Sequence, residues 1–82
     1  MSDRLGDIEE AVAALGRGDP DTARAAIARA AVTDASIGPI AHAVILACEE
    51  IESDGEVSPS TWNVVADACP PELMPVVEAS RR

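Results

Sequence analysis

The stretch EIESDGEVSPSTWNVV, residues 50–65, carries the signals that end one helix and begin the next. Gly55 favours the left-handed backbone conformation that terminates helices. Ser58 followed by Pro59 is typical of an N-cap and a first helical position, where the N–H that proline lacks is not needed. The stretch therefore predicts a tight corner between two helices, with Val57 pointing inward.

Apolar residues recur at helical intervals on both sides of this corner. The upstream helix is expected to run from Pro39 to about Ser53, and its stripe is formed by Ile40, Val44, Ala47, Cys48 and Ile51. The stripe of the downstream helix is formed by Trp62, Val65, Ala66 and Cys69, and the pair Pro70–Pro71 ends it. The upstream helix is apolar on nearly every face, so it should be central or covered by a partner, and we expect a homodimer.

A second hairpin is predicted upstream, with helices from about Asp3 to Gly16 and from the Asp19–Pro20 cap to about Val32–Asp34. The corner of this hairpin, with Gly18, Ala23, Ile27 and Ala30, resembles the second half of a tetratricopeptide repeat. The resemblance implies a helix-pair geometry and no solenoid, because a solenoid needs about three repeats. Residues 71–82 predict a short, weak helix or a tail. The fold class is therefore all-α: one domain over residues 1–82, a small orthogonal or antiparallel bundle of two hairpins, about four helices, plus a short C-terminal helix.

Composition restricts the partners. The chain has 82 residues, a net charge of −9, no Lys, no Phe or Tyr and one Trp. A strongly negative chain argues against nucleic acid and anionic membrane as partners. The run Ile40–Cys48 is too short to span a bilayer, and the start MSDRLGDIEE lacks the pattern of a signal peptide. We expect a cytoplasmic protein with reduced cysteines, and the exclusive use of Arg suggests a GC-rich bacterial genome.

The corner resembles two functional motifs. Residues 57–67, VSPSTWNVVAD, are similar to the second helix of repressor helix-turn-helix domains, which implies DNA binding. However, no basic residue lies between Arg29 and Arg81, and the surrounding carboxylates would repel phosphate. The same corner resembles an EF-hand calcium loop, which implies ligands at Glu50, Glu52, Asp54 and Ser58 and the sharp turn at Gly55. It departs from that loop at Glu50, where Asp is usual, and at Thr61, where a bidentate Glu is usual.

The charge of the corner has no local structural reason. Glu49, Glu50, Glu52 and Asp54 lie at the end of a predicted helix, where each carboxylate opposes the helix dipole by about 0.3–1 kcal/mol. Unexplained departures of this kind are common at functional surfaces. We name the set Glu49, Glu50, Glu52, Asp54 and Glu56 the acidic corner. It predicts either a docking surface, which a basic protein partner would suit, or a solvated face.

Catalytic patterns are missing from the sequence. His42 is the only histidine, and no nucleophile and base can be paired with it from spacing alone. Cys48 and Cys69 are expected to be offset along the hairpin by about two helical turns, which is too far apart for a disulfide. The tripeptide Arg17–Gly18–Asp19 resembles an integrin-binding motif, but a corner and an N-cap explain it. The predicted function is a non-catalytic protein–protein interaction or regulatory module without a cofactor; the alternative is a calcium-responsive module.

Overall fold

The computed structural model describes residues 4–81, and within them it is all-α, as the sequence predicts. Five α-helices follow one another: α1 (Arg4–Gly16), α2 (Pro20–Thr33), α3 (Gly38–Asp54), α4 (Pro59–Ala68) and α5 (Met74–Ser80). Two short 3-10 turns, η1 (Ala35–Ile37) and η2 (Pro71–Leu73), precede α3 and α5. No helix in residues 4–81 is both long enough and apolar enough to cross a bilayer.

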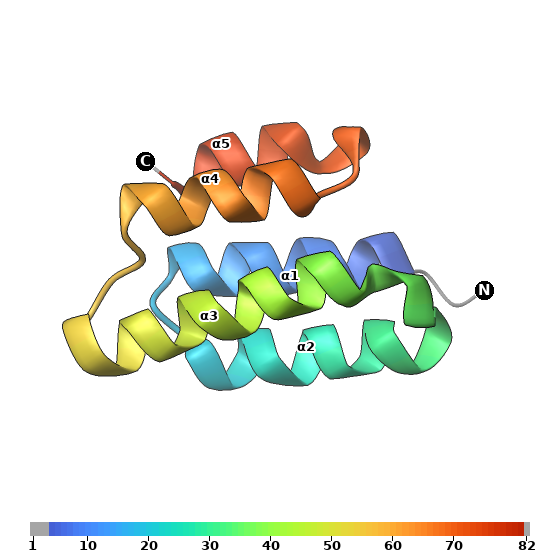
Figure 1. The fold of residues 1–82 in the computed structure, drawn as a ribbon, viewed down its shortest axis with the longest axis horizontal. Coiled ribbons are helices and arrows are strands. Elements are labelled where there is room, and N and C mark those ends of the chain that lie inside the picture. Colours follow the sequence, from blue (N-terminus) through green and yellow to red (C-terminus); the bar gives the residue numbers. More distant parts are fainter. Residues whose placement is uncertain (1–3, 82) are drawn as a thin grey trace.

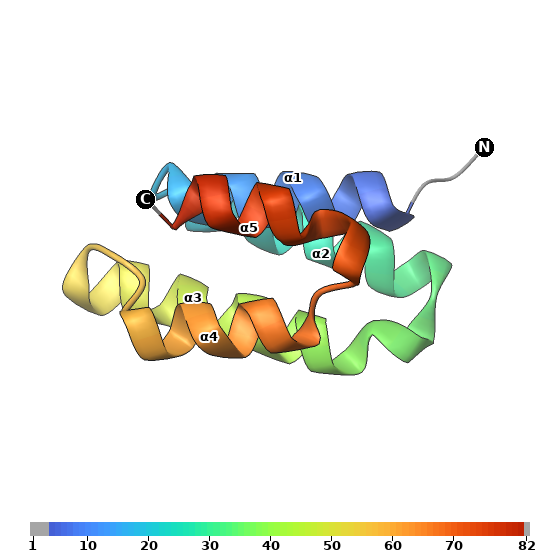
Figure 2. The same ribbon diagram turned by 90° about the horizontal axis from the view of Figure 1, so that it is seen from above.

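The helices pack side by side as a closed ring (Figures 1 and 2). Each helix contacts the next one in the chain, from α1 to α5, and α5 returns to pack against α1. Successive helices run in opposite directions along the 35 Å long axis. The α1–α2 and α3–α4 pairs are the two predicted hairpins, and α5 completes the ring between α1 and α4.

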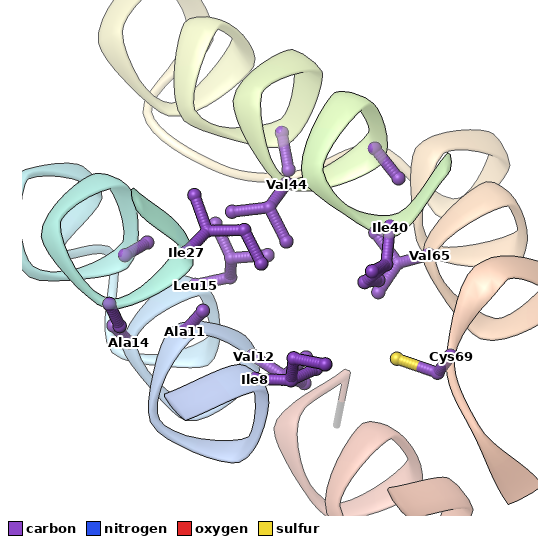
Figure 3. Close-up of a cluster of buried hydrophobic side chains, with 14 of the residues drawn as sticks. Ile8, Ala11, Val12, Ala14, Leu15, Ile27, Ile40, Val44, Val65 and Cys69 are labelled. Carbon is purple, nitrogen blue, oxygen red and sulfur yellow. The ribbon is translucent and has the colours of Figure 1, made fainter. Parts of the chain in front are cut away.

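Aliphatic side chains fill the interior of this ring (Figure 3). Ile8, Val12, Val44 and Val65 are among the side chains that point into it. Together with Val77 they are its largest fully buried residues, apart from a cysteine. Many of the remaining buried positions are Ala, which lets the helices approach closely. The one tryptophan, Trp62, is 7% exposed, which confirms its predicted burial.

The predicted caps are confirmed. Asp19 accepts a hydrogen bond from the backbone N–H of Thr22, at 3.2 Å, and Pro20 opens α2. Ser58 caps α4 by accepting from the N–H of Thr61, at 3.3 Å. Gly55 ends α3 with a φ of 89°, the left-handed conformation that its type favours. These local signals therefore determine where the hairpins turn.

The α1–α5 contact depends on a glycine inside a helix. A Cβ atom added at Gly16 would lie 2.8 Å from the carbonyl oxygen of Ser80 and 2.9 Å from its Cβ. Gly16 is not a positive-φ residue, so no turn requires it. The close approach of the two helix ends is the reason for a residue without a side chain at this position.

Candidate functional site

Glu50 points across the α3–α4 corner to the start of the next helix. One carboxylate oxygen accepts a hydrogen bond from the backbone N–H of Ser58, at 2.8 Å, and the other accepts from the hydroxyl of Thr61, at 2.5 Å. These bonds hold the pKa of Glu50 below its ordinary value, and the bond from Thr61 has the larger effect. Thr61 is itself only 4% exposed. Glu50 is therefore a side-chain cap of α4.

Glu52 is also engaged within the molecule. Its two carboxylate oxygens pair with the two terminal guanidinium nitrogens of Arg24 on α2, at 2.7 and 2.8 Å. The hydrogen bonds from Arg24 lower the pKa of Glu52. The pair is 35% and 49% exposed, so it joins α2 to α3 at the surface and contributes little to stability.

These two contacts correct one inference from the sequence. The carboxylates at the end of α3 were expected to lack compensation, and the structure supplies it for Glu50 and Glu52. Both contacts cross from one helix to another, so neither could be seen in the local pattern. Three members of the acidic corner, Glu49, Asp54 and Glu56, have exposed side chains for which the structure shows no such compensating contact within residues 4–81.

The structure brings Glu50 of the calcium motif to Ser58 and Thr61, but it does not bring Glu52 to the same place. Within α3 a spacing of two residues places Glu52 about 200° around the helix from Glu50. Glu50 is turned to α4 and Glu52 to α2, while the hydroxyl of Ser58 lies 3.0 Å from that of Thr61. Within residues 4–81 no three His, Cys, Asp or Glu side chains form a group that could hold a metal ion.

A groove lies at the end of the ring beside the acidic corner. Its volume is about 660 Å³, and its walls come from three chain segments: the α1–α2 turn, the α3–α4 corner and the end of α5. The buried residues Leu15, Val57 and Trp62 contribute apolar surface. The charged residues are Asp54, Glu56, Arg17 and Arg81. We call this pocket the end groove.

The end groove was not predicted. Asp54 and Glu56 were identified as docking residues, but their apolar neighbours were assigned only to the core. Leu15, Trp62 and Arg81 are far apart in the sequence, and only the closing of the ring brings them to one pocket. The signal that could have pointed to it is Trp62, the single aromatic residue, in the first turn of a helix that begins at the acidic corner.

The remaining candidates are two cysteines, one histidine and the tripeptide 17–19. Both cysteines are free and buried; burial raises the pKa of the Cys69 thiol to about 11 and also raises that of Cys48. His42 is exposed. In the tripeptide 17–19, Gly18 turns the chain with a φ of 72° and Asp19 caps α2.

Comparisons of the chain with protein-family models, with curated proteins and with solved structures found no match.

Proposed function

We propose that this protein is a non-catalytic protein–protein interaction module that binds a peptide segment of its partner in the end groove. The observation that carries the proposal is the meeting of apolar surface from Leu15, Val57 and Trp62 with the exposed carboxylates of Asp54 and Glu56 in one pocket. An apolar centre surrounded by a polar rim is typical of protein-binding surfaces.

A basic partner segment would suit this groove. The net charge of −9 steers cationic segments toward the molecule. α3 ends at the groove beside Asp54, and the C-terminus of a helix carries partial negative charge. We therefore expect an apolar residue of the partner to contact Trp62 and a neighbouring Arg or Lys to contact Asp54 and Glu56. A cytoplasmic location suits the two buried thiols, which form no disulfide.

Self-association through α3 has less support. The ring already buries six of its residues. Ile45 is 37% exposed, and one partly exposed isoleucine is ordinary for a surface. The homodimer remains a proposal that sedimentation of the wild-type protein at high micromolar concentration would test.

Trp62 provides the direct test, because it lines the groove and is the only aromatic residue. The probes are synthetic peptides that each place Leu next to two Arg residues, with matched peptides carrying Glu in place of Arg. We expect the basic peptides to change the emission of Trp62 and the effect to weaken with salt, because exposed charges are screened over about 8 Å at physiological ionic strength.

Two double variants with the same net charge locate the binding. Asp54→Lys/Glu56→Lys should abolish the response, whereas Glu9→Lys/Asp67→Lys, at exposed positions outside the groove, should retain it. Proteins that co-purify with the wild type should follow the same pattern. Equal behaviour of the two variants, or no change in emission with any peptide, would contradict the proposal.

A further inference from the structure

The helix that completes the ring is weakly attached. α5 has seven residues, too few to be stable as an isolated helix. Val77 is its one buried residue, and Leu73 of η2 is the other buried side chain of this segment. Neither α5 nor η2 has a side-chain cap. In the described chain one side-chain hydrogen bond ties the segment down, from half-buried Arg81 to exposed Asn63, at 3.1 Å.

The surface beneath α5 fits side chains of particular sizes. Leu73, Val77 and Ser80 are spaced i, i+4 and i+7, so they lie along one face of the helical segment. The first two are buried, and the third lies against Gly16 at a distance that admits no added methyl group. Figure 3 shows Ile8 and Val12 of α1 and Cys69 after α4 pointing into the interior. The site between α1 and α4 thus accepts a large, a medium and a small side chain in that order.

The linker to α5 is already extended. Cys69 has a ψ of 146°, and Pro70 has a φ of −58° and a ψ of 147°, which is the conformation of a polyproline segment. Proline fixes φ at Pro70, so the linker is redirected by rotation about ψ of Cys69 and Pro70. A change confined to these few residues would carry α5 away from its own chain while the four longer helices stay in place.

We propose that α5 is an exchangeable helix, and that the site between α1 and α4 takes the α5 segment of a second copy of this chain. The second copy is the occupant because α5 itself shows the side chains that the site accepts. On a short linker the chain's own α5 competes at an effective concentration on the order of millimolar. The wild-type protein should therefore be closed at micromolar concentration, and exchange should appear when the intramolecular pairing is weakened.

Two variants with complementary defects test this proposal. Gly16→Ala damages the site and leaves α5 intact, because the new methyl group would collide with Ser80. Val77→Asp damages α5 and leaves the site intact. Mixed at high micromolar concentration, the two should form a species of twice the monomer mass in sedimentation, and the melting temperature of the Val77→Asp chain should rise. A mixture that sediments and melts as the sum of its components would overturn the proposal.

If Val77→Asp fails to fold, the less disruptive variants Val77→Ala and Gly16→Ala/Val77→Ala test the proposal instead. A fluorescent peptide with the sequence of residues 70–82 should bind Val77→Ala at least ten times more tightly than Gly16→Ala/Val77→Ala. Gly38→Ala is the matched glycine control, because no atom lies within 4 Å of its added Cβ, and Gly38→Ala/Val77→Ala should bind like Val77→Ala. Equal binding to all three, or binding to none, would show that α5 is a fixed part of the fold.

Discussion

Replacing Glu50 by Ala should destabilise the protein, although Glu50 lies at the end of a helix where a carboxylate is electrostatically unfavourable. The change removes the acceptor for the backbone N–H of Ser58 and for the hydroxyl of Thr61. Thr61 is nearly inaccessible to water, so its hydroxyl cannot exchange the lost bond freely for solvent. Its remaining partner is the hydroxyl of Ser58, at 3.0 Å.

The magnitude follows from the number and exposure of these bonds. A hydrogen bond to a charged group contributes about 1.5–3 kcal/mol when its partner is removed. Glu50 is half-buried, so water can replace part of the lost hydrogen bonding. Removing a charge that opposes the dipole of α3 also stabilises the folded protein by about 0.3–1 kcal/mol. We expect a net loss of about 2 kcal/mol in the free energy of unfolding, which lowers the melting temperature by roughly 8–16 °C in a domain of this size.

Circular dichroism during urea and thermal unfolding measures this loss, and its pH dependence identifies the cause. The pKa of Glu50 is lower in the folded protein than in the unfolded chain. Its contribution is therefore fully present above the unfolded-state pKa and is lost as the pH falls through the folded-state pKa. The difference in stability between wild type and Glu50→Gln should shrink over this acidic range.

Glu49→Ala is the matched control, because it removes an adjacent, exposed carboxylate from the same helix end. Because Glu49 caps no helix, its replacement should leave the free energy of unfolding unchanged or raise it slightly. If Glu50→Ala and Glu49→Ala unfold at the same urea concentration, the bonds across the corner contribute nothing and the reasoning is refuted.

Two other substitutions and one measurement of thiol reactivity test the core and the turns. Trp62→Ala should cost about 3–5 kcal/mol, measured by urea unfolding, and the wild type should show blue-shifted emission; a solvent-like maximum would contradict burial. Gly55→Ala forces a side chain into a φ of 89° and should cost roughly 1–2 kcal/mol in the same assay, whereas an unchanged midpoint would exclude this strain. Cys69, whose pKa is raised to about 11, should react with a disulfide reagent at pH 8 only after unfolding; rapid reaction of the native protein would show that its thiol is accessible.

The helix boundaries could be predicted because their causes are local. Asp19 with Pro20, and Ser58 with Pro59, lie next to the backbone groups that they complete. The stripe that buries Val44 and Ile51 is likewise visible within a few turns of one helix. Such signals involve residues close in sequence, so no knowledge of the packing is needed to recognise them.

The side-chain roles at the corner could not be predicted, because they depend on how the helices pack. Glu50 reaches Thr61 eleven positions away, and Arg24 reaches Glu52 across 28 positions. Gly16 was expected only to end a helix, and its contact with Ser80 exists because the last helix returns to the first. The end groove depends on the same closure, so it was beyond any local pattern.

The number of helices in the ring has an electrostatic consequence. In a ring whose successive helices alternate in direction, every pair of helices next to each other in the ring is antiparallel only if the number of helices is even. With five helices, the first and the last must be parallel. That pair is α1 and α5, which run the same way and end together at Gly16 and Ser80. Two helix C-termini, each partially negative, therefore meet at this seam, and Arg17 and Arg81 directly follow them in the chain. In an acidic protein these two cations offset the partial negative charge where the C-termini of α1 and α5 meet.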